Sequence, residues 1–160
     1  MNAARQTASP LYTPENYNLE DSLGRLIADV SRQLQAAIDV ELAARGLGIT
    51  AAQWGILLRI ANGCATTSAQ LCRTTRHDTG SMTRMLDRLE DKGLIRRVRN
   101  PNDRRMLSLE ITEEGRALYP LLTPVAIKVL NDHLDGFTRE ELNQFTGFLR
   151  RMRANSERQA

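Results

Sequence analysis

Aromatic residues, histidine and cysteine are all scarce in this 160-residue chain. Aromatic residues make up only 4% of the sequence, although 41% of it is apolar. No stretch approaches the roughly 18 consecutive apolar residues that cross a membrane. The first residues, MNAARQTASPLYTPENYN, also lack an apolar core of signal-peptide length. We therefore expect a protein that stays in the cytoplasm and has no membrane partner.

The scarcity of histidine argues against a catalytic or metal centre. The two histidines, His77 and His133, belong to no cluster with the spacing of metal ligands or of a catalytic triad. The glycine-rich motifs G-x-G-x-x-G and G-x-x-x-x-G-K are absent too. We therefore expect no enzymatic activity and no metal, and the sequence indicates no cofactor.

The two cysteines, Cys64 and Cys72, lack the C-x-x-C spacing of zinc sites. In a reducing compartment, two free thiols are the default state. A redox-responsive role through Cys64 and Cys72 stays open as an alternative.

Positive charge is concentrated in one segment of the chain. Residues 73–105 contain ten basic and five acidic residues, a balance of +5. The remainder contains twelve basic and fourteen acidic residues, a balance of −2. Such a cluster indicates a polyanionic partner such as DNA, with a solvated charged face as the alternative.

Helical periodicity and capping residues organise the first half of the chain. Apolar residues at steps of three and four predict one long helix over residues 18–45. Capping boxes beginning at Thr50 and Thr67, and Asp78 as a cap, predict three shorter helices. These helices are expected at about residues 51–62, 68–75 and 79–92.

The apolar period changes to two after Gly93. Residues 94–98 and 107–111 therefore predict two antiparallel strands, joined by a turn-rich basic loop. Two further helices follow, at residues 113–135 and 138–155. Pro120 and Pro124 should kink the first of these helices or split off its first turns.

This order of elements predicts a mainly α (α+β) fold. It is a winged helix-turn-helix with a two-stranded β-wing and N- and C-terminal dimerisation helices, because the amphipathic terminal helices leave surplus apolar surface. The expected parts are a polar N-terminal extension (1–17), dimerisation helices (18–48 and 113–160) and a DNA-binding lobe (50–112).

Two groups of polar residues are placed to contact duplex DNA. The second helix of the motif enters the major groove by its N-terminal part, which carries Thr79, Ser81, Thr83 and Arg84. Arginine suits guanine because it can donate two parallel hydrogen bonds. The expected tip of the hairpin carries Arg99, Arg104 and Arg105, and a narrow minor groove attracts such side chains.

The stretch SMTRMLDRLEDKGLIRRVRNPNDRRMLSLEITEEGRAL resembles the MarR (multiple antibiotic resistance regulator) family. The resemblance implies a homodimer whose first, fifth and sixth helices interlock and whose two motifs read a pseudo-palindromic operator. It implies that Arg84 reads the major groove, that Arg105 enters the minor groove and that Asp103 orients the wing arginine. Three further candidate DNA contacts are Ser68, Arg76 and Arg88.

The resemblance also suggests a ligand-responsive repressor, in which a small ligand weakens DNA binding. The ligand would lie where the dimerisation helices meet the DNA-binding lobe, near Arg32, Trp54, Leu58 and Arg59. A small aromatic or phenolic carboxylate fits, since an arginine would hold the acid while Trp54 stacks. Trp54 as a core residue is the alternative. A non-sensing winged-helix protein-interaction module is the other alternative for the whole chain.

Overall fold

The computed structural model of the chain describes residues 9–75, 78–99 and 107–158. Its elements are α1 (Leu23–Ala44), α2 (Ala51–Ala61), α3 (Ser68–Thr75), α4 (Thr79–Asp91), β1 (Ile95–Arg99), β2 (Leu107–Ile111), α5 (Glu113–Ala117), α6 (Tyr119–His133) and α7 (Arg139–Glu157). The two strands form one antiparallel sheet. The predicted mainly α winged helix-turn-helix fold is confirmed.

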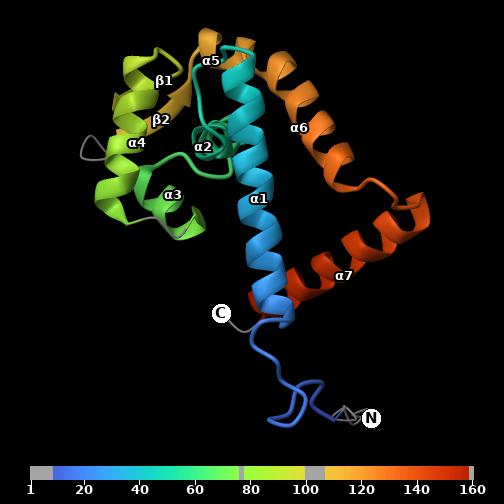
Figure 1. Cartoon of the computed structure of the whole chain (residues 1–160). Coiled ribbons are helices and arrows are strands. Elements are labelled where there is room, and N and C mark those ends of the chain that lie inside the picture. The colour runs from blue at the N-terminus through green and yellow to red at the C-terminus, as the bar shows by residue number, and fades with distance from the viewer. Residues whose placement is uncertain (1–8, 76–77, 100–106, 159–160) are drawn as a thin grey trace, which may run out of the picture.

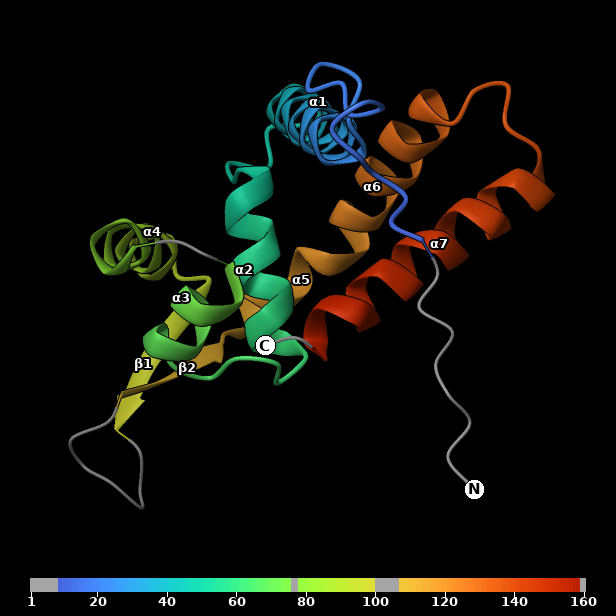
Figure 2. The same cartoon turned by 90° about the horizontal axis from the view of Figure 1, so that it is seen from below.

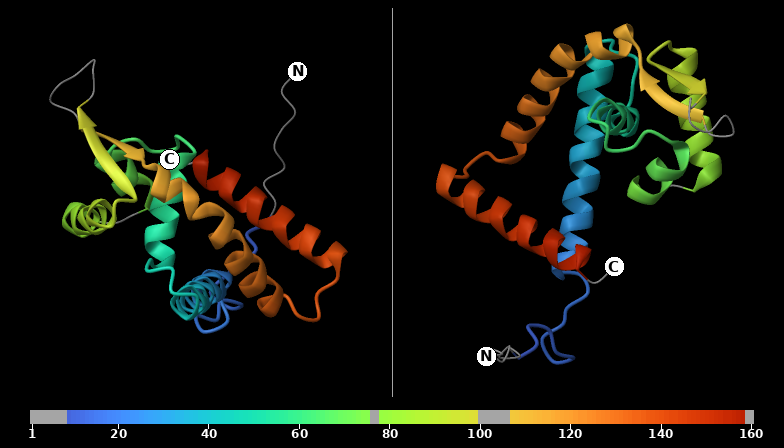
Figure 3. Two further views of the ribbon diagram at one scale, coloured as in Figure 1. Left: turned by 90° about the horizontal axis from the view of Figure 1, so that it is seen from above. Right: turned by 180° about the vertical axis from the view of Figure 1, so that it is seen from behind.

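The helices are arranged as a frame with a lobe on one side (Figure 1). The lobe contains α2, α3, α4 and the β-sheet, and it lies to one side of the long helix α1. Helix α6 runs back along α1. Helix α7 follows the end of α6 that lies farther from the lobe, and it runs in a different direction. The views in Figures 2 and 3 show α7 standing apart from α4 and the sheet.

One apolar core holds the lobe together and joins it to α1 and α6. Its fully buried side chains are Leu42, Ile56, Leu57, Leu71, Met82, Leu86, Leu89, Ile95, Leu122 and Val125. Burial of each such side chain contributes about 1.5–3 kcal/mol to folding. Because α4 supplies three of these residues, its inner face is fixed against the core and its outer face must point to solvent.

The predicted caps form as hydrogen bonds. Thr50 Oγ1 accepts from the Gln53 backbone at 3.2 Å, and Gln53 Oε1 accepts from the Thr50 backbone at 3.1 Å. The same reciprocal pair joins Thr67 and Gln70 at the start of α3. These bonds satisfy backbone N–H groups that a helix start leaves free, so the helix boundaries follow from the sequence.

The prediction that the first helix begins at residue 18 is wrong. Helix α1 begins at Leu23, with Ser22 as its N-cap and Ser22 Oγ accepting from the Arg25 backbone at 3.4 Å. The apolar stripe continues back to Leu19, which lies outside the helix with 64% of its surface exposed. Periodicity alone therefore extended the helix through its cap.

Residues 9–17 of the expected polar extension, together with residues 18–22, form turns that lead into α1. Asn16 Oδ1 accepts from the Thr13 backbone at 2.8 Å, and the Tyr12 hydroxyl accepts from the Leu23 backbone at 3.2 Å. The rings of Tyr12 and Tyr17 meet edge to face at 5.8 Å. The extension thus presents exposed apolar side chains beside α1.

The β-hairpin is shifted by one residue at its start. Strand β1 begins at Ile95 rather than at residue 94, and Ile95 pairs with Ile111 while Arg99 pairs with Leu107. The Leu109 backbone N–H also donates to the Thr66 carbonyl at 2.8 Å, which ties the hairpin to the segment before α3. The wing is therefore anchored to the lobe at the middle of β2.

The predicted break in the next helix is confirmed. Helix α5 ends at Ala117, and α6 begins at Tyr119 with Pro120 in its first turn. Thr112 caps α5 by accepting from the Gly115 backbone at 3.0 Å. The change of direction at Leu118 allows α6 to leave the lobe and pack along α1.

No helix in the described part of the chain is long and apolar enough to cross a membrane.

Candidate nucleic-acid interface

Helix α4, which is predicted to enter the major groove, is fixed at its N-terminus by Asp78. One carboxylate oxygen of Asp78 accepts from the Ser81 backbone at 2.8 Å, and the other accepts from Ser81 Oγ at 2.6 Å. These bonds from Ser81 hold the pKa of the Asp78 carboxyl below its usual value of 3.8. The cap is therefore charged at neutral pH and also favoured by the helix dipole.

The outer face of α4 presents most of the predicted major-groove contacts to solvent. Thr79, Thr83, Arg84 and Arg88 are exposed, whereas Ser81 is half-buried. The hydroxyl of Thr83 donates to the Thr79 carbonyl at 2.8 Å. Among the described residues, neither Arg84 nor Arg88 forms an ion pair. Their guanidinium groups are therefore available to an external partner.

A small cavity lies between this face and the start of α2. Its volume is about 170 Å³, and its lining residues are Thr50, Gln53, Ser81, Arg84, Met85 and Arg88. Two arginines therefore share one hollow beside the cap of α2. This arrangement gives the outer edge of α4 a local positive potential that favours phosphate.

The remaining predicted DNA contacts are distributed between α3 and the wing. Ser68 is half-buried at the first position of α3, and Arg99 is exposed at the end of β1. The other four, Arg76, Asp103, Arg104 and Arg105, lie outside the described residues. The predicted groups thus come together in part, since five of them lie on α4: Thr79, Ser81, Thr83, Arg84 and Arg88.

Sequence reasoning missed the role of Arg97. The alternation of side chains along a strand puts Arg96 and Arg97 on opposite faces of the sheet, but it does not say which of the two arginines has a partner. In the structure Arg97 binds Asp87 and Glu90 of α4, with 2.7 Å between Arg97 Nη2 and Asp87 Oδ1. Arg96 pairs with Glu110 on the exposed face of the sheet at 2.7 Å. The signal available in the sequence was the spacing of Asp87 and Glu90, whose carboxylates lie three residues apart on α4 and can bind one arginine together.

The predicted ligand-binding residues differ in their surroundings. Arg32 is exposed and pairs with Asp29 on α1, whereas Arg59 is half-buried and donates to the Gly55 carbonyl at 2.8 Å. Leu58 is half-buried. Trp54 packs against the core, and its buried indole Nε1 has no hydrogen-bond partner within the described residues. None of these four residues lines the cavity beside α4 or the cavity beside the base of the wing.

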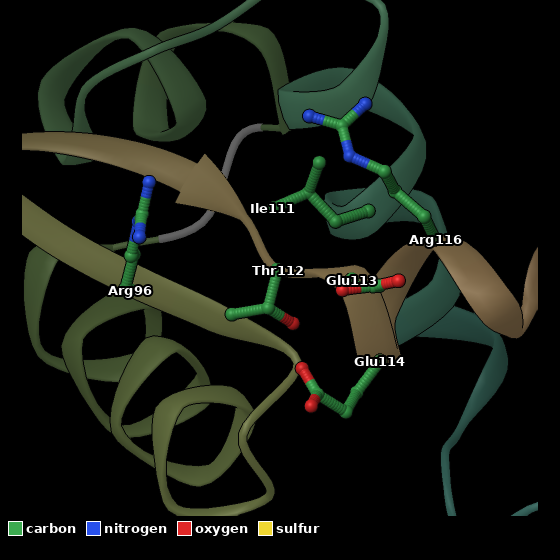
Figure 4. A pocket seen from close by; sticks show the side chains of 6 residues that line it. All are labelled: Arg96, Ile111, Thr112, Glu113, Glu114 and Arg116. Carbon is green, nitrogen blue, oxygen red and sulfur yellow. The ribbon is translucent and has the colours of Figure 1, made fainter.

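A larger cavity of about 630 Å³ lies beside the base of the wing (Figure 4). It is lined by Arg96, Ile111, Thr112, Glu113, Glu114 and Arg116. Figure 4 shows Arg96 rising from β1 on one side and Arg116 on the other. Residues of both charges line it, so it has no single preference for anions or cations.

The two cysteines are free thiols in different environments. Cys64 is exposed, and Cys72 is half-buried on α3. In the parts of the chain that the structure covers, no three His, Cys, Asp or Glu side chains form a group that could hold a metal ion.

Comparison with known proteins identifies the family of this winged fold. The family model described as MarR family matches residues 47–106. The multiple antibiotic resistance protein MarR of Escherichia coli K12 is 37% identical over 106 residues, which cover 66% of this chain and 72% of that protein. The chain belongs to the MarR family.

Solved structures agree with the family assignment. A crystal structure of MarR superposes with a TM-score of 0.80 at 29% identity, covering 89% of this chain and 96% of that one. A MarR family transcriptional regulator from Listeria monocytogenes, complexed with 26mer DNA, gives a TM-score of 0.72 at 28% identity. That match covers 84% of this chain and 88% of the other. As a MarR family member, the chain is a DNA-binding transcription regulator and not an enzyme.

Proposed function

We propose that the chain is a ligand-responsive repressor that binds a pseudo-palindromic operator as a homodimer. The observation that carries the proposal is the outer face of α4, where Arg84 and Arg88 are exposed and without ion pairs among the described residues. The proposed lobe spans residues 50–112, and residues 18–48 and 113–160 supply the dimerisation helices. The proposed repressor acts in the cytoplasm, where operator DNA is accessible.

Exposed apolar side chains on the terminal helices support the dimer. They gather on the first half of α1 and along α7: Leu23, Leu26, Ile27, Val30, Phe145, Phe148, Leu149 and Met152. Helix α7 has no buried residue at all within one protomer. Soluble monomers rarely leave apolar faces of this extent uncovered, so a second copy is the proposed cover.

Selection of binding sites from random duplexes tests the DNA-binding proposal. We expect a two-fold symmetric consensus with half-sites about 34–36 Å apart, one turn of B-DNA. Affinity should fall steeply with salt, because each phosphate contact releases counterions. A flat salt dependence would instead favour the protein-interaction module, and an asymmetric consensus would contradict the two-fold dimer.

The proposed effector is a small aromatic or phenolic carboxylate bound near Arg32, Trp54, Leu58 and Arg59. The buried Trp54 Nε1 supports this proposal, because a buried donor without an acceptor costs about 1–3 kcal/mol and a bound ligand could remove that cost. A thermal-shift screen of aromatic acids, followed by displacement of operator DNA, tests it. Stabilisation that persists unchanged in Trp54→Phe would place the ligand elsewhere.

A redox response is the second candidate for the signal. The exposure of Cys64 favours it, since an oxidant can reach the thiol. The expected result is release of operator DNA by peroxide, reversed by a reducing agent. If peroxide releases DNA from Cys64→Ser and from Cys72→Ser as readily as from the wild type, neither cysteine senses the oxidant and this candidate is removed.

A further inference from the structure

An ion-pair cluster joins the recognition helix to the wing. Arg97 on β1 donates from Nη2 to Asp87 Oδ1 at 2.7 Å and from Nη1 to Glu90 Oε2. Its backbone N–H also donates to Glu90 Oε1 at 3.0 Å. A single residue of the wing therefore holds two carboxylates that lie one helical turn apart on α4.

The Arg97 cluster is better shielded from water than the neighbouring pair on the same strand. The Arg97 side chain is 24% exposed, against 66% for Arg96 in its pair with Glu110. Partly buried, multiply bonded guanidinium groups order their partners more strongly than exposed single pairs do. Burial lowers the pKa of Arg97, but its bonds with Asp87 and Glu90 outweigh this and raise the pKa overall.

The position of Asp87 and Glu90 on α4 allows the cluster to set the orientation of this helix relative to the wing. Arg84 lies three residues before Asp87, on the part of the helix that is proposed to enter the major groove. Strand β1 leads directly from Arg97 to its last residue, Arg99, which belongs to the expected tip of the hairpin. A shift at the cluster would therefore change the angle between the groove-reading helix and the wing.

We propose that Arg97 is a positioning residue for operator recognition, which holds α4 and the wing at the angle needed to reach two adjacent grooves at once. The proposal rests on the proposed DNA-binding function and adds a residue that does not itself contact a base. Its effect is on the match between helix and wing, so it should act on specific binding much more than on general attraction to DNA.

The test compares Arg97→Met with Arg96→Met in the full-length protein. Both changes remove one positive charge from β1 and leave at least one carboxylate without its partner, so their general electrostatic effects are matched. We expect Arg97→Met to lower affinity for the selected site about tenfold more than Arg96→Met does, since coupled charged contacts reach this size. Affinity for random duplex should be similar in the two variants. The salt slope should also agree, because neither arginine is assigned a phosphate contact.

A charge exchange provides the second readout. The double variant Glu90→Arg with Arg97→Glu restores an ion pair across the same interface and should recover part of the specific affinity that Arg97→Met loses. If Arg97→Met does not fold, Arg97→Lys takes its place, because a lysine keeps the charge but cannot hold both carboxylates with a planar fork. That variant should relax the consensus at the base pairs read by α4.

Three outcomes would overturn the inference. Equal specific affinity of the Arg97 and Arg96 variants would show that the cluster sets no angle. Equal loss on specific and random duplex would make the role one of general stability. A salt slope reduced by about one ion only in Arg97→Met would make Arg97 a direct phosphate contact. If the wild-type protein itself prefers no sequence, the proposed function fails instead, and this result is separate from the other three.

Discussion

The backbone carbonyl oxygen of Leu94 lies against Gly115, so close that a Cβ atom on residue 115 would be 2.2 Å from it. The same Cβ would lie 2.7 Å from Ile111 Cγ1. Thr112 ties the same joint from the other side, since its hydroxyl donates to the Gly93 carbonyl at 2.6 Å. The end of the wing and the start of α5 therefore meet with no room for a side chain.

Gly115→Ala should destabilise the protein. Overpacking of a tight contact typically costs about 1–3 kcal/mol, and backbone cannot move aside as a flexible side chain can. Thermal or denaturant unfolding measures the change. Gly147→Ala is the matched control, because its Cβ would meet nothing within 4 Å in helix α7. That control should be neutral or stabilise by up to about 1 kcal/mol, and equal behaviour of the two variants would contradict the close contact.

Arg84→Ala should weaken binding to the operator far more than binding to random duplex. A bidentate contact with guanine contributes about 1–3 kcal/mol of discrimination, whereas an exposed helical ion pair contributes only a few tenths. Arg84→Lys should recover part of the loss, since a lysine lacks the planar fork. Binding-site selection is the measurement. The same consensus for wild type and Arg84→Ala would leave Arg84 as a surface charge.

Asp78→Ala should lower the free energy of unfolding, because it removes the N-cap of α4. Asp78→Asn should retain most of the cap. The pKa of Asp78 is lowered by its bonds from Ser81, so the charged form stabilises the fold above pH 3.8 and this contribution is lost as the pH falls through the lowered value.

Denaturant unfolding of wild type and Asp78→Asn across this pH range tests that dependence. The two curves of stability against pH should differ at neutral pH and converge in acid. A difference that grows as the pH falls would have the wrong sign for a depressed carboxyl pKa.

Phe148→Asp should dissociate the proposed dimer. The side chain of Phe148 is 53% exposed within one protomer and lies in the apolar stripe of α7. An obligate interface of roughly 2,000 Å² or more does not tolerate an unpaired carboxylate at its centre. Analytical ultracentrifugation at micromolar protein gives the mass. Val40→Asp, at an apolar residue in the second half of α1 that is 70% exposed, should remain dimeric. A monomeric wild type would refute the dimer itself.

Local chemistry allowed most of the fold to be predicted. The caps at Thr50, Thr67 and Asp78 use bonds within three or four residues, so the sequence carries both partners. The change of period after Gly93 likewise marks the wing. The start of α1 was predicted less well. The apolar stripe continues back to Leu19, but the hydroxyl of Ser22 caps the N-terminus of the helix, so the helix begins only at Leu23.

Contacts between residues far apart in the sequence limited how much of the site could be predicted. The exposure of Arg84 follows from the apolar spacing of α4 alone. By contrast, the pairing of Arg97 with Asp87 depends on how β1 crosses α4, which no local pattern encodes. The surroundings of Trp54 depend on the same kind of long-range packing, so its unpaired indole could not be foreseen from the sequence.

The exposed apolar stripe of α7 has a consequence for the life of the chain in the cell. None of its 19 residues is buried within one protomer. A newly made chain thus displays an apolar stripe to chaperones and proteases until it meets a second copy. Slow synthesis prolongs that interval and rapid synthesis shortens it. The proposed dimer therefore couples survival of the regulator to its own rate of synthesis, before any operator is bound.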